Sequence, residues 1–174
     1  GLGTSNFYEV IETDSTASQA QQDQKGNYWD SFLNIDLNYD KRNQKFQTSS
    51  GFKSYYSLDL PIISKKNTLK NYYNYSHYFD LFDQNVSTFS LMLKTANSIT
   101  NDNIKLSERI NLPSSKLRGF EVGRIGPKDG EDIMGGNYAA AVNFSSTMPQ
   151  IFEESQNVEL LYFFYVANLW GVDY

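Results

Sequence analysis

Few side chains in this sequence could carry covalent or metal chemistry. The 174 residues contain no cysteine, which excludes thiol nucleophiles, disulfides and cysteine-based zinc sites. The single histidine, His77, has no second histidine with which to hold a metal, and it stands in a tyrosine-rich segment. The adjacent acids Glu131-Asp132 and Glu153-Glu154 lie in turn-like segments, where we expect solvated charges. No nucleophile has an obvious base, so we predict no catalytic residue, no metal and no cofactor.

A glycine-rich segment is the most unusual local feature. Six of the eleven glycines fall between Gly119 and Gly136. Because glycine permits positive φ and a close approach of the backbone, we predict that this segment folds back on itself or against a wall of the protein. It contains neither G-x-G-x-x-G nor Gly-Lys-Ser/Thr, and it does not join a strand to a helix. A phosphate-binding loop is therefore not expected.

Alternation of apolar and polar residues dominates the chain and predicts strands. In the clearest segment, Tyr28 to Asp40, one parity is apolar from Trp29 to Tyr39 and the other is mostly Asn and Asp. Seven such segments are predicted: Asn6–Thr13, Tyr28–Asp40, Phe52–Leu60, Thr68–Phe79, Val86–Thr95, Asn137–Ser146 and Asn157–Asn168. Turn-forming residues separate them, so the pattern favours an all-β, antiparallel, up-and-down architecture.

The connectors between these segments predict the topology. If consecutive strands are antiparallel neighbours, the two longest connectors, 14–27 and 97–136, lie on the same rim of the sheet. Long loops on one rim and shorter turns on the other are typical of an outer-membrane barrel. Connector 97–136 has 40 residues, and loops beyond about 15 residues are usually functional. The polar, low-complexity run Gln19 to Gln24 is expected to be a flexible surface loop.

Composition limits the function further. A net charge of −5 argues against a general nucleic-acid binder, and no apolar run approaches the roughly 20 residues of a spanning helix. Trp29 and Tyr39 share the apolar parity ten residues apart, about 33 Å along a strand. Tilted by about 40°, this length projects to about 25 Å, the height of the apolar band of a membrane barrel. Two core aromatics of a soluble β-sandwich would give the same pattern, so both readings stay open here.

A motif in the long connector resembles that of a known family. The segments Leu117–Phe120, Ile125–Lys128 and Gly135–Asn137 read Leu-Arg-Gly-Phe, Ile-Gly-Pro-Lys and Gly-Gly-Asn. Together they resemble the signature of the BamA family, also called the bacterial surface antigen family, whose motif is (Val/Ile/Leu)-Arg-Gly-(Phe/Tyr). The run Tyr165–Trp170 is similar to the family's Asp-Ala-Gly-Asn-Val-Trp.

The resemblance implies a fold, a function and a location. It implies a transmembrane β-barrel of about sixteen strands, preceded by POTRA domains. We interpret residues 1–174 as a partial barrel domain of about seven strands, because the sequence begins without Met and ends after an apolar run. The implied function is folding and insertion of β-barrel proteins into the outer membrane of a Gram-negative bacterium. The implied partners are unfolded outer-membrane clients, outer-membrane lipid and accessory lipoproteins.

The resemblance also implies a site in the lumen. The long extracellular loop folds into the barrel, Arg118 pins it to acidic side chains of the wall, Gly119 allows the close approach, and Phe120 packs beside it, with Leu117 completing the motif. Loop-supporting residues are expected at Gly126, Pro127, Gly135, Gly136 and Asn137. A guanidinium in a partly desolvated lumen needs charged or several polar partners, so this pairing is physically sensible.

The sequence departs from the family at the wall. The positions facing Arg118 that are usually acidic are Asn143 and Tyr165, and neither can form an ion pair at neutral pH. Either Arg118 donates hydrogen bonds to neutral groups, or it reaches another acid with lumen parity. Acids with that parity include Glu159, Asp36 and Asp59.

Three other functions remain compatible with the sequence alone. A relative in the same family could export a polypeptide through its lumen or assemble autotransporters. A passive porin-like channel would conduct ions without affecting other proteins. A soluble β-sandwich binding module would stay in the aqueous fraction without detergent.

Overall fold

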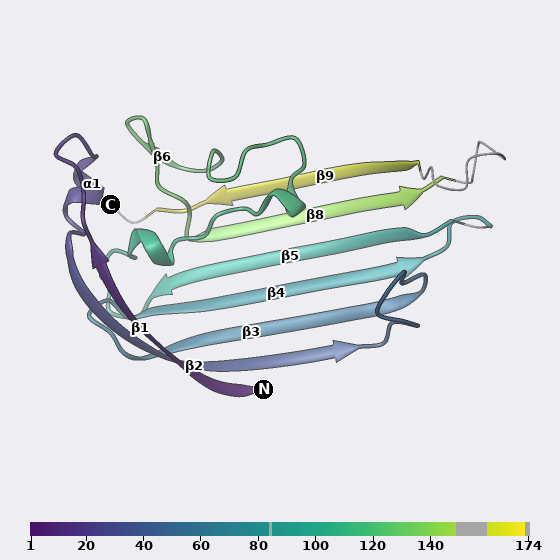
Figure 1. The fold of residues 1–174 in the computed structure, drawn as a ribbon, viewed down its shortest axis with the longest axis horizontal. Coiled ribbons are helices and arrows are strands. Elements are labelled where there is room, and N and C mark those ends of the chain that lie inside the picture. Colours follow the sequence, from purple (N-terminus) through teal and green to yellow (C-terminus); the bar gives the residue numbers. More distant parts are fainter. Residues whose placement is uncertain (84, 149–159, 173–174) are drawn as a thin grey trace.

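One sheet of seven antiparallel strands forms the body of the molecule. The computed structural model describes residues 1–83, 85–148 and 160–172, and its sheet has the order β1-β2-β3-β4-β5-β8-β9 (Figure 1). The strands are β1 (Leu2–Ile11), β2 (Gly26–Asp40), β3 (Gly51–Ile63), β4 (Thr68–Phe79), β5 (Ser87–Ser98), β8 (Tyr138–Thr147) and β9 (Leu161–Trp170). A second sheet, the short hairpin β6 (Lys128–Asp129) and β7 (Asp132–Ile133), lies within the connector from β5 to β8.

The predicted all-β fold class and its seven strands are confirmed. Each strand pairs with the next along the chain, with one irregularity in register between Ser31 and Phe32. The structure adds three short helices that alternation does not predict: α1 (Gln19–Gln22), η1 (Leu106–Glu108) and η2 (Ser114–Lys116). The first three residues of the last predicted strand, the acids Glu153-Glu154 and Glu159 lie outside the described residues.

Strand β2 exposes its apolar parity and buries much of the parity that is mostly polar. On β2, Trp29 and Leu37 are 58% and 61% exposed, whereas Asp30 and Phe32 are 2% exposed. A water-soluble sheet would do the reverse, because burial of apolar surface drives its folding. The single layer and its apolar outer face belong to a membrane barrel, so the β-sandwich interpretation is wrong. We call the face that buries Asp30 the inner face.

Aromatic side chains gather on the outer face near both rims. Near the short-turn rim, ring centroids lie 5.5–6.3 Å apart in a chain formed by Tyr39, Phe52, Tyr75, His77 and Phe79. Near the other rim, the ring pairs are Tyr8–Trp29 and Tyr138–Trp170. These are the positions of the aromatic girdles that flank the apolar band of outer-membrane barrels. Among the described residues, no helix is long and apolar enough to cross a membrane.

The two long connectors lie on the same rim, as predicted. They are residues 12–25 and 99–137, and both begin and end at the left of Figure 1. The backbone N–H of Ser18 donates to Asp132 Oδ2 at 3.1 Å, which joins the two connectors. The prediction of a flexible surface loop at 19–24 is wrong, because Gln24 is buried and its side chain hydrogen-bonds to the long loop.

Candidate functional site

The long loop, residues 99–137, packs against the inner face of the sheet. Its buried side chains Ile104, Ile110 and Leu112 form one hydrophobic cluster with inner-face residues of three strands, namely Met92, Ala96, Ala139, Ala141 and Leu169. Figure 1 shows the loop running along β8 and β9. The glycine-rich segment meets this wall beside Leu169, at Gly126 and Gly136, so the prediction that it folds against a wall holds for that part of the segment. The main core of this sheet is therefore formed between the loop and the strands, not between two sheets.

Two glycines let the loop backbone approach β9. A Cβ atom added at Gly126 would lie 2.6 Å from Leu169 Cδ2, and one added at Gly136 would lie 2.9 Å from Leu169 Cδ1. Both distances are too short for real carbon atoms, so neither position has room for a side chain. Gly126 also has a φ of +125°, which L side chains rarely adopt. The buried side chain of Leu169 is thus held against loop backbone on two sides.

Backbone hydrogen bonds hold the end of the loop. Gly136 and Ile110 exchange two bonds of 3.0 and 2.8 Å, and Asn137 N–H donates to the carbonyls of Trp170 and Gly171. The carbonyl of Pro127 accepts from Met134 N–H at 2.9 Å. Gly135 has a φ of +69°, and a Cβ there would lie 3.0 Å from the Ile110 carbonyl oxygen. The structure therefore brings Gly126, Pro127, Gly135, Gly136 and Asn137 into one supported part of the loop.

Arg118 contacts aromatic rings of β9. Its guanidinium carbon lies 5.0 Å from the centroid of Phe163 and 5.6 Å from that of Tyr165, within the range of cation–π attraction. Leu117 is half-buried, whereas Arg118, Gly119 and Phe120 are exposed. The close approach expected at Gly119 is not seen among the described residues, because a Cβ there would contact nothing; the φ of +85° is what favours glycine at this position.

The two wall residues expected to face Arg118, Asn143 and Tyr165, make different contacts. Asn143 stands opposite Tyr165 in the register of β8 and β9, and its Nδ2 donates to the Lys116 carbonyl at 2.8 Å. Its Oδ1 is buried and has no hydrogen-bond partner among the described residues. Tyr165 is a ring partner of Arg118, and Asn143 instead holds η2, the turn that precedes the motif.

The two described acids proposed for Arg118 are engaged elsewhere. Asp36 accepts a hydrogen bond of 2.7 Å from the Tyr55 hydroxyl. Asp59 accepts one of 2.7 Å from Asn34 and lies 4.0 Å from Lys70 Nζ. The described residues show neither of the two alternatives left open by the sequence, because Arg118 meets the ring faces of Phe163 and Tyr165, and Glu159 lies outside the described residues.

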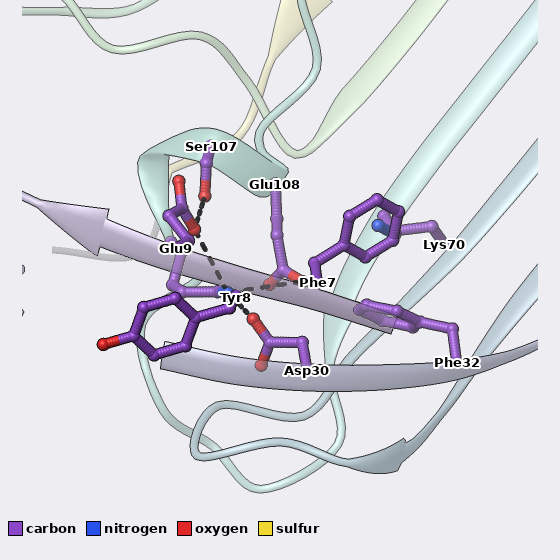
Figure 2. Close-up of a pocket in the computed structure, with 9 residues that line it drawn as sticks. Phe7, Tyr8, Glu9, Asp30, Phe32, Lys70, Ser107 and Glu108 are labelled. Carbon is purple, nitrogen blue, oxygen red and sulfur yellow. Dashed lines mark hydrogen bonds and ion pairs between the residues drawn. The ribbon is translucent and has the colours of Figure 1, made fainter. Parts of the chain in front are cut away.

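Sequence reasoning missed Lys105, a buried cation of the loop. Its side chain is 2% exposed, and its Nζ forms an ion pair with Asp30 of β2. Glu9 of β1 lies 3.5 Å from the same nitrogen, and Glu108 of η1 lies 3.8 Å away. Figure 2 shows these three acids converging beneath η1. We call Lys105 and the three carboxylates the lysine cluster.

Further contacts fix the lysine cluster to both connectors and to β4. Thr68 Oγ1 donates to Glu108 Oε2 at 2.6 Å, and Ser107 Oγ donates to Glu9 Oε2 at 2.8 Å. Gln24 binds on both sides of Lys105: its Oε1 accepts from Leu106 N–H at 2.6 Å, and its Nε2 donates to the Ile104 carbonyl at 3.3 Å. Beside the cluster lies an open cavity of about 330 Å³, lined also by Phe7, Phe32 and Lys70.

Burial and charge act in opposite directions on the loop's titratable groups. Burial would lower the pKa of Lys105, but the Asp30 hydrogen bond and the nearby carboxylate charges outweigh it and raise that pKa. Burial raises the pKa of Glu108 by more than its Thr68 bond and the Lys105 charge lower it. Burial lowers the pKa of Lys116, whose Nζ donates to Asn74 Oδ1 at 3.0 Å. Lys105 is therefore charged at neutral pH.

No signal in the sequence marks Lys105. It stands in a turn-rich segment, and its acidic partners on the strands lie 75 and 96 positions away. Asp30 does have the parity of the inner face, so a buried carboxylate at that position predicts a cation opposite it. The sequence does not say which of the loop cations that would be.

Comparison with known proteins agrees with this architecture. A model of the Omp85 superfamily domain matches residues 4–174. The fold is similar to that in the crystal structure of BamA from Haemophilus ducreyi lacking POTRA domains 1-3, with a TM-score of 0.79 and 20% sequence identity. That match covers 98% of this chain and 38% of the BamA chain, so this chain spans well under half of its length. A comparison with curated proteins finds no match. The barrel-type sheet and the domain match together establish that the chain belongs to the Omp85 superfamily.

Proposed function

We propose that this chain is part of an assembly factor that folds and inserts β-barrel proteins into the outer membrane of a Gram-negative bacterium. Membership of the Omp85 superfamily supports this, together with the Leu117–Phe120 resemblance. The observation that carries the proposal is the motif-bearing loop packed against the inner face of a sheet whose outer face is apolar. In this arrangement the outer face contacts lipid and the loop, entering from the extracellular side, occupies the lumen.

Such a factor works without covalent chemistry. Unpaired backbone N–H and C=O groups cannot lie in hydrocarbon, so a client strand needs a partner while it enters the membrane. A strand edge of the factor supplies those hydrogen bonds until the client barrel closes. The partners are therefore unfolded outer-membrane clients and membrane lipid, with accessory lipoproteins delivering or positioning the clients.

The proposed task of the Arg118 motif is to hold the exposed middle part of the loop against β9. Arg118 rests on Phe163 and Tyr165 where the family pattern has carboxylates. A cation–π contact contributes about 0.5–1 kcal/mol at an exposed site and more when desolvated. Two rings therefore hold the motif by about 1–2 kcal/mol, enough to bias its position without immobilising it.

The test is Arg118→Ala in the full-length protein, with Arg124→Ala as its matched control. Arg124 belongs to the same loop, but it is exposed, and its ion-pair partner among the described residues is Glu121, 3.3 Å away. We expect Arg118→Ala to lower the amount of folded outer-membrane proteins in cells, and Arg124→Ala to leave it unchanged at equal abundance. Normal client levels with Arg118→Ala, together with steady ion conductance in planar bilayers, would instead identify a passive channel.

A further inference from the structure

We propose that Lys105 is the positioning residue that fixes the long loop inside the barrel, through the carboxylates of Glu9, Asp30 and Glu108. This inference deepens the proposed function, in which the loop has to occupy the lumen. It places the ion-pair anchor of the loop at Lys105, outside the Leu117–Phe120 motif. The wall strands that hold this anchor are β1 and β2, whereas the motif contacts β9. The motif arginine then holds only the exposed middle part of the loop.

Burial and charge distinguish the lysine cluster from the motif. The Lys105 side chain is 2% exposed and lies within 4 Å of three carboxylates, one of them in direct ion pair with it. Arg118 is exposed and meets two rings. Removing one partner of a buried ion pair leaves charges without compensation in a region of low dielectric constant, which is far more costly than losing an exposed contact.

The cluster also has the geometry of an anchor. Glu9 and Asp30 come from β1 and β2, whereas the hydrophobic cluster under the loop comes from β5, β8 and β9. Glu108 is tied in turn to β4 through Thr68. The loop is thus attached across the inner face, from one end of the seven-strand sheet to the other. Without Lys105, the contacts to β1 and β2 would bring three carboxylates together with no cation between them.

The charged groups around Lys105 come from several elements. Besides the three carboxylates, Lys70 of β4 faces the same cavity and lies 4.2 Å from the Phe32 ring. Its Nζ is 4.0 Å from Asp59, and its charge also favours the ionised form of Glu108, so Lys70 acts on the edge of the lysine cluster as well as on Asp59. Tyr28 of β2 places its ring 5.0 Å from Lys105 Nζ, which adds a cation–π contact to the ion pairs.

A cysteine placed beneath the loop reports its position. Ala139 is 2% exposed because the loop covers it, and Ala140 is the adjacent residue on the opposite face of β8. In the full-length protein without other reactive cysteines, Ala139→Cys should react slowly with a water-soluble maleimide. Adding Lys105→Met should raise that rate at least about tenfold, because the loop leaves the inner face more often.

Matched variants separate an anchor from a general loss of folding. Lys105→Arg keeps the charge and should restore slow labelling of Ala139→Cys in large part. Glu9→Gln removes a peripheral partner and should raise labelling by a smaller factor than Lys105→Met. Arg118→Ala should raise it by no more than about threefold, since its contacts are exposed. Ala140→Cys should label at the same rate in every background.

The outcomes that overturn the inference are specific. Slow labelling of Ala139→Cys in the Lys105→Met protein, or equal labelling in the Lys105→Met and Lys105→Arg proteins, would show that the charge does not anchor the loop. If Lys105→Met does not fold, as judged by unheated gel mobility, the Glu9→Gln and Lys105→Arg proteins decide by the same criterion. Fast labelling of Lys105→Met with normal levels of folded clients would support the anchor and refute the proposed need for the loop in assembly.

Discussion

The contact between Gly126 and Leu169 allows the placement of the loop to be tested by a double-mutant cycle. Leu169→Ala removes a buried side chain, and losses of this kind cost about 2–5 kcal/mol. We expect a value near the middle of this range, about 3–4 kcal/mol, because the glycines above Leu169 have no side chains with which to fill the cavity.

The second substitution, Gly126→Ala, is costly for two reasons. Its Cβ would lie 2.6 Å from Leu169 Cδ2, and overpacking of this kind costs about 1–3 kcal/mol. The φ of +125° adds backbone strain of about 1–3 kcal/mol. In the double variant the clash disappears, because the remaining Leu169 Cβ position is 3.7 Å from the new methyl group, an ordinary contact. The double variant should therefore be more stable than the sum of the single losses by about 1–3 kcal/mol.

The assay is urea unfolding of the full-length protein in detergent micelles, with the slope checked for constancy across variants. Gly130 provides the control, because it also has positive φ (+61°) but a Cβ there would contact nothing. Its cycle with Leu169→Ala should be additive within about 0.5 kcal/mol. Additivity of the Gly126 cycle to the same limit would refute the position of the loop on β9.

Two further predictions concern the wall and the lysine cluster. Cysteines at Asn34 and Ile35 should label at different rates with a water-soluble maleimide, fast at Asn34 and slowly at Ile35. The reason is that successive side chains of β2 face the lumen and the lipid in turn, and equal rates would contradict a barrel. Burial raises the pKa of Glu108, so the folded state holds a proton that the unfolded chain has released, and stability is lost as pH rises above the ordinary value of 4.5. Glu108→Gln should show a smaller loss of urea stability from about pH 4.5 to neutral pH, and identical pH profiles would refute this role of Glu108.

The strands were predictable because their signal is local. Alternation along Tyr28 to Asp40 reports which side chains face lipid, and each strand carries its own copy of that pattern. The shared rim of the two long connectors follows from counting strands. A close approach of the loop backbone to the wall could be predicted from the clustered glycines, and Gly126 and Gly136 make it. The residue that they approach, Leu169, could not be identified from the sequence.

The polar contacts of the loop were not predictable, because they depend on residues far apart in sequence. Gln24 lies in a polar run that suggests a solvated surface. It is buried in the folded protein because its side chain hydrogen-bonds to the backbone of Ile104 and Leu106 in the long loop. The burial and ion pairs of Lys105 could not be predicted for the same reason, because its three acidic partners come from β1, β2 and η1. At the motif, the sequence correctly shows that Asn143 and Tyr165 are not acids, but the ring of Phe163 enters only through the folded register.

The lysine cluster also has a consequence for the order in which the chain folds. Neighbouring strands meet through hairpins, whereas Lys105 and Asp30 are 75 positions apart, and Ser107 and Glu9 are 98 apart. Contacts of such separation form late, because the chain loses more entropy in closing them. We therefore expect the carboxylates of β1 and β2 to stay hydrated and unpaired in the early folding intermediates. They lose this water only when the loop docks on the inner face. The slowest phase of refolding should accordingly follow docking of the loop, and Lys105→Met should change that phase more than the pairing of the strands.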